Sequence, residues 1–459
     1  MVTQNAGIVT GPPPEVLASL WRLCPEVGRD VTEHWHAPLS SYAQHLWRPT
    51  RVPTSRLGAT ARSILRETLQ DRLAAHMPAD SLQAALVEFD RRAVIQTGLH
   101  CQLLLDRITF DAFLLSWLGA VENSLSAFLV FTGATMTMET IGREGPGWLD
   151  LGPDKINLFG VGRHKLSRKS VCATGPVSLN KRALETAGDA TDAARWLGVL
   201  LERGDEVFGN AADALASLNE NLASEWDRSA ATRPIFFDDR LAAAALARHL
   251  EDEDSVPSKL LTDPQRRCRL EHALQMASCG PFGSFLPTGT AYFWGVRNER
   301  VRKLVVEQGR LIEPERPQGL SIPLDRLHLR EALLGGTLLP NLFLLFLVLA
   351  IVPRVRVLGG LRQIGYVPLF QSVVLAALDG SLAEECDLAA DLETRESGWG
   401  MRVIDELYPV RDQLAGMQAG YILPELHRRY RDRTLCEVTQ DLRAIRENAR
   451  WRKLAQAER

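Results

Sequence analysis

Most of the lysines in this chain fall in one short basic stretch, residues 155–182. Lysine accounts for only 7 of the 53 basic residues, and four of the seven lie in this stretch: Lys155, Lys165, Lys169 and Lys181. Three arginines add to them and no acidic residue intervenes, while the whole chain has a formal net charge of −3. Such a run is typical of a surface that meets phosphate, carboxylate or a nucleic-acid backbone.

Within this basic stretch, residues 160–170 have the composition of an anion-binding loop. Glycines that follow a strand let backbone N–H groups approach an oxyanion, and Lys and Arg add charge and forked donors. We therefore predict that Lys165, Arg168 and Lys169 bind the substrate. The segment matches neither the Walker A pattern nor the G-x-G-x-x-G fingerprint. The alternative is a solvated basic loop or a contact for an acidic partner, because charge runs are usually surface features.

His164 and Cys172 are the predicted catalytic residues in the same stretch. A histidine can act as a general acid or base, and a cysteine can act as a nucleophile. Nothing in the sequence fixes the geometry between them. The alternative is that both are ordinary residues of a surface loop.

A second candidate site covers residues 280–297. Two turn sequences rich in Gly and Pro lead there into Tyr292, Phe293 and Trp294. The Thr288 hydroxyl and the Arg297 guanidinium are predicted to line a pocket with aromatic walls. The alternative is a hairpin whose aromatic side chains pack on helices.

A third candidate site follows the glycine pair at residues 359–360. It comes after the most apolar segment of the chain, where a turn can present polar groups at a cavity. Arg362 is predicted to hold a carboxylate with two parallel hydrogen bonds, oriented by Gln363 and Tyr366. The alternative is a helix-breaking turn with a solvated arginine.

The familiar catalytic and metal-binding motifs are missing from the sequence. His34, His36 and His45 form an early cluster. Its H-x-H pair could bind a metal, but the flanking sequence offers no third ligand at regular spacing, and neither H-E-x-x-H nor C-x-x-C occurs. No nucleophile-elbow serine motif and no kinase signature can be read either. The sequence therefore predicts no metal site, and it leaves the cofactor unknown.

Hydrophobic periodicity predicts a mainly helical protein with small β elements, an α+β class. The expected β elements are a hairpin at residues 148–159, a meander at residues 291–315 and a short strand at residues 355–358. We expect helices at residues 80–96, 110–131, 239–252, 263–278, 367–392 and 401–417, and one long exposed helix at residues 425–458. Since strands and helices do not alternate regularly in this assignment, a Rossmann fold or a barrel is disfavoured and two short antiparallel meanders or hairpins are expected.

The run from Leu342 to Val352 is continuously apolar. Its 11 residues fit a buried core helix, whereas a membrane-spanning helix needs about 20 apolar residues. A membrane contact through this run is the lesser alternative. Seven scattered cysteines favour reduced thiols, and the N-terminus has no secretory signal pattern, so a cytoplasmic location is expected.

Composition shifts divide the chain into five expected regions. They are an N-terminal helical region at 1–132, a Gly-rich hairpin with the basic loop at 133–181, a helical region at 182–279, a meander with the buried helix and the Gly-Gly loop at 280–397, and C-terminal helices at 398–459.

The sequence alone favours a cytoplasmic enzyme of small-molecule biosynthesis, a class that includes the biosynthesis of specialised metabolites. It would transfer or ligate a group on a small anionic substrate bound by the basic loop. The alternative is a noncatalytic protein whose basic stretch docks an acidic partner or an RNA. Nucleic acid is the less favoured partner, because only Phe159 could stack a base near the basic run. The oligomeric state is left open.

Overall fold

The computed structural model describes residues 11–456, apart from residues 76, 140–144, 151–154, 191–193, 230–231, 288, 315, 317, 395, 406–416 and 419. Its centre is a five-stranded sheet in the order β13-β12-β1-β2-β5, and all four strand pairs are parallel. The strands are β1 (Val94–His100), β2 (Ala127–Gly133), β5 (Arg233–Asp238), β12 (Arg356–Gly359) and β13 (Ser397–Trp399). Strand β1 is the middle strand.

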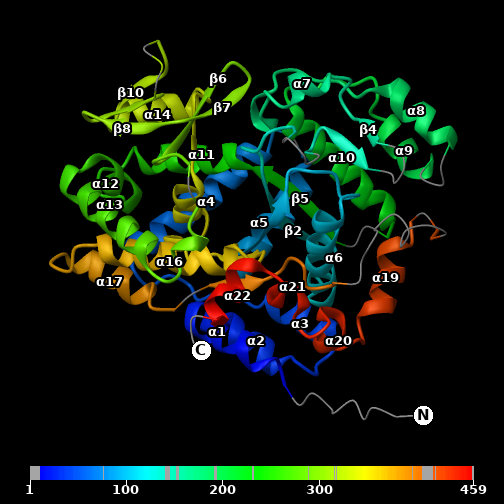
Figure 1. Ribbon diagram of the computed structural model, residues 1–459, viewed down its shortest axis with the longest axis horizontal. Coiled ribbons are helices and arrows are strands. Elements are labelled where there is room, and N and C mark those ends of the chain that lie inside the picture. Colours follow the sequence, from blue (N-terminus) through cyan, green and yellow to red (C-terminus); the bar gives the residue numbers. More distant parts are fainter. Residues whose placement is uncertain are drawn as a thin grey trace.

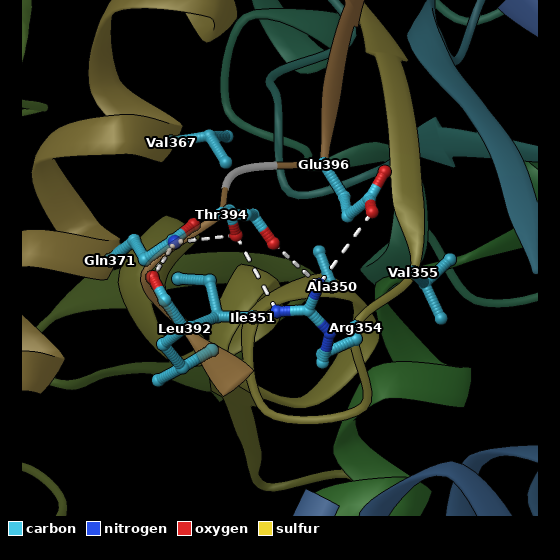
Figure 2. A pocket seen from close by; sticks show the side chains of 9 residues that line it. All are labelled: Ala350, Ile351, Arg354, Val355, Val367, Gln371, Leu392, Thr394 and Glu396. Carbon is cyan, nitrogen blue, oxygen red and sulfur yellow. Dashed lines mark hydrogen bonds and ion pairs between the residues drawn. The ribbon is translucent and has the colours of Figure 1, made fainter. Parts of the chain in front are cut away.

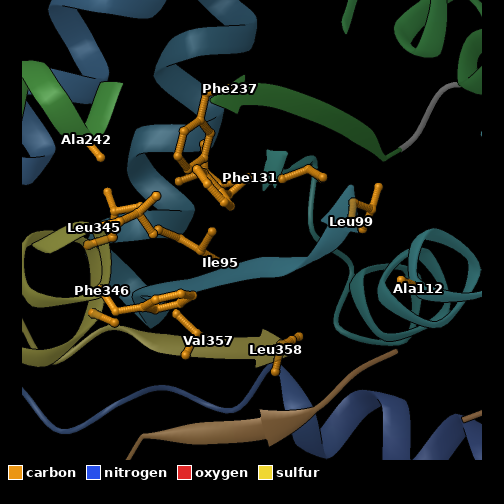
Figure 3. Packing of buried hydrophobic residues seen from close by; sticks show 14 of the residues in the cluster. Ile95, Leu99, Ala112, Phe131, Phe237, Ala242, Leu345, Phe346, Val357 and Leu358 are labelled. Carbon is orange, nitrogen blue, oxygen red and sulfur yellow. The ribbon is translucent and has the colours of Figure 1, made fainter. Parts of the chain in front are cut away.

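Both faces of this sheet are covered, so its strands are buried along their length. In β1 only the last residue, His100, is exposed. Ile95 packs with Phe131 and Phe237 of neighbouring strands and with Phe346 beyond the sheet (Figure 3). On the other face, Gln96 donates a hydrogen bond to the carbonyl of Ala112, 3.1 Å away. Parallel sheets require such cover on both faces, which helices provide.

Helices lie around the sheet (Figure 1). The first group is α1 (Pro14–Leu23), α2 (Pro25–Glu33), α3 (Leu39–Leu46), α4 (Arg56–Leu73) and α5 (Ala79–Arg92), and α6 (Arg107–Glu122) follows β1. The middle of the chain forms α7 (Arg163–Leu166), η1 (Val171–Ala173), α8 (Lys181–Ala190), α9 (Ala194–Leu201), α10 (Ala211–Trp226), α11 (Asp239–His249), α12 (Val256–Thr262), α13 (Pro264–Cys279) and η2 (Gly283–Phe285). The last part forms α14 (Arg326–Leu334), α15 (Leu342–Phe346), η3 (Leu347–Ile351), α16 (Gln363–Ala377), α17 (Ala383–Asp391), α19 (Ile422–Tyr430), α20 (Leu435–Thr439), α21 (Arg443–Arg446) and α22 (Ala449–Gln456).

The antiparallel elements expected from turn patterns are present. Strands β3 (Trp148–Asp150) and β4 (Lys155–Asn157) form the predicted hairpin. The residues of the predicted meander form strands β6 to β9, but these belong to two separate sheets, β11-β6-β7 and β10-β9-β8, each of which contains one strand from outside residues 291–315. Their strands are β6 (Phe293–Arg297), β7 (Arg300–Lys303), β8 (Val305–Glu307), β9 (Arg310–Ile312), β10 (Ser321–Pro323) and β11 (Leu338–Pro340).

The mixed, mainly helical class is confirmed, but the expectation of only short antiparallel β elements is wrong. The sequence interpretation extended the helix before β1 to residue 96 and read residues 110–131 as one helix, which hid β1 and β2. In the structure, α5 ends at Arg92 and Ala93 adopts a left-handed conformation with φ 51° before β1 begins. A strand buried on both faces has a continuous apolar sequence, which periodicity cannot distinguish from a buried helix.

The C-terminal region also differs from its prediction. The expected long exposed helix at residues 425–458 is divided among α19, α20, α21 and α22, and its apolar side chains Leu426, Tyr430 and Trp451 are buried. Gln440, Asp441 and Leu442 adopt positive φ angles, which break the helix between α20 and α21. The predicted helix at 367–392 is likewise two helices, α16 and α17, and the one expected at 401–417 falls mostly outside the described residues.

The apolar run at residues 342–352 forms α15 and the π-helical turn η3, and apart from the exposed Leu342 it is buried in the core as expected. Among the residues described above, no helix combines the length and the apolar composition needed to cross a membrane.

Close packing between α3 and α6 leads to a stability prediction. A Cβ atom at Gly119 of α6 would overlap the backbone carbonyl of Ala43 and the ring of Trp47, whereas a Cβ at Gly198 of α9 would meet nothing within 4 Å. We expect Gly119→Ala to lower the free energy of unfolding by about 1–3 kcal/mol through overpacking. Gly198→Ala should raise it by up to about 1 kcal/mol, since alanine is the better helix former. Urea denaturation of both variants checks this, and equal effects would contradict it.

Candidate functional site

The strand order of the parallel sheet creates a topological switch point between β1 and β12. From β1 the chain proceeds to β2 and β5 on one side of the sheet, and then returns to place β12 and β13 on the other side. The chain therefore leaves β1 toward β2 and leaves β12 toward β13, in opposite directions beyond the carboxyl ends of these two strands. In open α/β sheets, ligands bind at such a position. We call this place the switch-point crevice.

The carboxyl end of β1 is distorted where it meets this crevice. The register between β1 and β2 shifts between Gln96 and Leu99. The Gln96 side-chain oxygen accepts a hydrogen bond from the backbone N–H of Gly98 at 2.6 Å, which stabilises the irregular segment. A Cβ at Gly98 would lie 2.9 Å from the Cβ of Met401. Bulges of this kind often lie next to active sites, because they redirect the strand end.

The loop after β12 leads directly into α16 and leaves donors free. The N-cap residue of α16 is Arg362, and no side chain caps the helix. The backbone N–H of Ile364 bonds to Gly360, but those of Arg362 and Gln363 have no acceptor within the described part of the chain. The start of a helix carries partial positive charge and free N–H groups, so it favours an anion.

Two cationic or titratable side chains, Arg362 and His100, line the crevice. Both are exposed to solvent, yet desolvation by surrounding protein is the largest effect on each and lowers both pKa values. Arg362 makes no hydrogen bond or ion pair within the described residues, so its guanidinium is available to a ligand.

The charge of Arg362 acts on the pKa values of two other groups, His100 and Tyr366. The pKa of His100 is lowered mainly by burial; the Asp106 carboxylate opposes this and the Arg362 charge adds to it. Burial also raises the pKa of Tyr366, an effect that Arg362 opposes. Tyr366 is buried, and its ring packs against Phe346 and Phe370.

The C-terminal helix α22 and the η2 turn complete the wall of the crevice. Trp451 donates from its indole nitrogen to the carbonyl of Leu361 at 2.9 Å, and its ring centroid lies 5.1 Å from that of Phe285. Arg450 donates to the carbonyl of Ser284 at 2.7 Å, and its charge contributes to lowering the pKa of Arg362. A second guanidinium therefore stands near the first.

The third sequence-predicted site thus lies at the switch point, although its residues differ in accessibility. Arg362 faces solvent, as a ligand-binding residue must. Gln363 is buried, and its amide donates to the hydroxyl of Thr97 on β1, so it connects the two loops of the crevice. Tyr366 lies one turn further along α16. A direct substrate contact by each of these three residues stays a prediction.

The structure does not bring the basic stretch to this crevice. His164, Lys165 and Arg168 are exposed on or beside α7, which lies apart from α16 and α22 (Figure 1). Lys169 is instead paired with Glu299 at 2.7 Å. Burial holds the pKa of the Cys172 thiol well above its usual value, with the Asp239 and Asp238 charges acting in the same direction. This lowers the fraction of thiolate, which is the nucleophilic form.

The second sequence-predicted site can be described only in part. Thr288 lies outside the described residues. Arg297 is paired with Glu313 across 3.4 Å, at the tip region of the β6–β7 hairpin. The aromatic residues Tyr292 and Phe293 are buried against the core, in agreement with the packing alternative.

Sequence reasoning missed His100, Arg450 and the bulge at Gly98. The signal for His100 was weak, because the run of residues 94–99 that it follows contains the polar residues Gln96 and Thr97. It was lost once that run was assigned to a helix. Arg450 has no local signal, because only the folding of α22 onto the loop after β12 brings it to the site.

The opposite, amino ends of β12 and β13 hold a paired network rather than a free cation. Glu396 accepts from Arg356 at 2.6 Å. Glu396 also lies 3.7 Å from Arg354, whose guanidinium donates to the Thr394 hydroxyl at 2.8 Å (Figure 2). The cavity beside Arg354 has room for roughly one water molecule. The charges at this end of the strands are therefore paired with one another.

Asp111 holds one wall of the crevice in place. Its carboxylate accepts hydrogen bonds from the backbone N–H groups of Arg402 and Ile404, in the segment that carries Met401 against Gly98. Burial raises the pKa of Asp111 to about 7, while the two backbone hydrogen bonds lower it in part. Burial similarly raises the pKa of Asp239 to about 7.

These raised pKa values predict that stability falls as pH rises. Between pH about 4 and 7 the folded state keeps a proton on Asp111 that the unfolded state has lost. The contribution of this group to the free energy of unfolding is therefore complete below pH about 4 and disappears as pH passes 7. We expect Asp111→Asn to flatten the slope of unfolding free energy against pH by up to about 1.4 kcal/mol per pH unit between pH 5 and 7. Urea denaturation at several pH values measures this. The exposed control Asp80→Asn should keep the parent slope, and an unchanged slope in Asp111→Asn would reject the assignment.

Metal ligation and relatedness add no further identification. Within the described ranges, no group of three or more His, Cys, Asp or Glu side chains is arranged to hold a metal ion. Comparison with known proteins finds no family model that matches the chain and no match among curated proteins.

Proposed function

We propose that this chain is an enzyme that binds a small anionic substrate in the switch-point crevice and transfers or ligates a group on it. The observation that supports this most is the free Arg362 guanidinium at the uncapped start of α16, directly beyond β12. A fixed cation and free backbone N–H groups that converge at a switch point favour a phosphate or carboxylate. Transfer and ligation are proposed because both act on such compounds.

Different residues of the crevice would bind the anionic group and transfer the proton. Arg362 and the N–H groups of Arg362 and Gln363 would bind the anionic group, and Arg450 would add positive potential. Because the pKa of His100 is lowered below its usual value near 6.5, the ring is mostly neutral at pH 7 and can accept a proton. His100 therefore replaces His164 as the favoured acid–base residue in this proposal.

The basic stretch supports a second candidate function. Its exposed Lys165 and Arg168, which have no ion-pair partner among the described residues, suit the noncatalytic docking of an acidic partner. The two functions use different surfaces, so they can be tested separately.

A thermal-shift experiment tests the enzyme proposal. The parent would be heated with ATP, coenzyme A, nicotinamide nucleotides, pyridoxal phosphate and amino acids in turn. A ligand at 100 times its Kd stabilises the folded state by about 2.7 kcal/mol, which raises Tm by a few degrees in a chain of this size. We expect at least one anionic ligand to give this shift in the parent and to lose it in Arg362→Ala.

Two control variants locate the site. Arg72→Ala changes an exposed arginine on α4, and Lys165→Ala/Arg168→Ala changes the basic stretch; both should keep the shift. If the shift persists in Arg362→Ala but vanishes in the double variant, the anion binds on the basic stretch and the crevice is excluded. If no ligand shifts the folded parent, the small-anion proposal is rejected.

A further inference from the structure

Folding joins the basic stretch to a second basic segment that is more than a hundred residues away in sequence. Lys169 pairs with Glu299 of the β6–β7 turn at 2.7 Å. The backbone N–H of Ser170 donates to the carbonyl of Glu299 at 3.0 Å, and the Ser170 hydroxyl accepts from the N–H of Val301 at 3.1 Å. The β6–β7 hairpin and α7 accordingly lie beside each other along one edge of the molecule (Figure 1).

The hairpin brings its own excess of positive charge. Arg297 and Arg300 are directly opposite each other in the β6–β7 register. Glu313 is the shared counterion of this region, with Arg297 at 3.4 Å, Arg302 at 3.9 Å and Arg316 at 3.3 Å. One carboxylate therefore faces three arginines. The Arg300 and Lys303 side chains have no ion-pair partner within the described part of the chain.

This arrangement is unfavourable in the isolated chain. Like charges directly opposite each other on a β ladder destabilise it. Desolvation lowers the pKa of Arg302, and the nearby charges of Arg316 and Arg300 lower it further. The buried Nε of Arg302 also lacks a hydrogen-bond acceptor. An external anion would relieve the repulsion, so the local field is suited to a partner that brings negative charge.

We propose that these two segments form one docking surface for an acidic protein segment. We call it the joined basic surface; its members are Lys165, Arg168, Arg297, Arg300, Arg302, Lys303 and Arg316. Carboxylates are already bound at this surface, since its arginines hold Glu313 and the adjoining Lys169 holds Glu299 in the geometry that an acidic side chain would use. The proposal is independent of ligand binding at the switch-point crevice.

A carboxylate-bearing partner fits this surface better than a nucleic acid. Binding of single strands relies on exposed aromatic rings that stack on bases. Among the described residues, the exposed large aromatic side chains are Trp21 and Tyr421, and neither belongs to these segments. Trp148, near α7, is half-buried and is covered by Arg163, whose guanidinium lies 5.7 Å from the ring centroid.

Fluorescence anisotropy with labelled poly-L-glutamate tests the proposal. Charge reversal on either segment, Lys165→Glu/Arg168→Glu or Arg300→Glu/Lys303→Glu, should weaken binding at least tenfold, because each reverses two of the seven charges of one surface. The matched control Arg72→Glu/Arg91→Glu changes the charge equally at exposed arginines of α4 and α5 and should change binding less than twofold. Binding should also weaken as salt rises.

Three results would overturn the proposal. Failure of the parent to bind poly-L-glutamate would exclude an acidic partner of this kind. Tighter binding of a labelled single-stranded RNA of the same length would assign the surface to nucleic acid instead. Sensitivity to reversal of one segment alone, or equal sensitivity to the control pair, would show that the two segments do not act as one surface. If a reversal variant fails to fold, the neutral pairs Lys165→Gln/Arg168→Gln and Arg300→Gln/Lys303→Gln replace it, with the same ranking expected.

Discussion

The burial of strand β1 on both faces and both edges is the constraint on which the rest of this structure depends. Its backbone pairs with β12 on one side and β2 on the other, and its side chains lie between α6 and the α15–η3 segment. Polar groups inside such a layer must be satisfied internally. Gln96 and Thr97 meet this requirement by bonding to neighbouring backbone and side chains, which also shapes the strand end.

The amino and carboxyl ends of the strands, called here the amino and carboxyl edges of the sheet, differ in how their charged groups are paired. At the amino edge, Arg354 and Arg356 share Glu396, and the small cavity there has room for about one water molecule. At the carboxyl edge, Arg362 and the first N–H groups of α16 have no partner within the described residues. Buried charges must be paired, whereas an unpaired cation in a solvated crevice can be held ready for a ligand.

Local signals predicted those parts of the structure that local chemistry specifies. Turn residues predicted the β3–β4 hairpin and the strands at residues 293–312, and a continuous apolar run predicted the buried segment at 342–352. The parallel strands β1, β2 and β5 escaped prediction, because strands covered on both faces lack the alternation that distinguishes them from buried helices. Missing them also removed the alternation of strand and helix from which a doubly wound sheet is inferred.

The sequence by itself determined the elements with local signals, the concentration of lysines near α7, and the Gly-Gly turn that presents Arg362. Only the tertiary structure decided that this turn stands beside β1, because strand order depends on contacts between segments more than two hundred residues apart. The tertiary structure also places the charge of Arg362 where it acts on His100, and it places Arg450 of α22 where it acts on Arg362. It likewise brings the basic stretch into contact with the β6–β7 hairpin. Each of these arrangements is fixed by long-range burial and hydrogen bonding, which no pattern within a single segment records.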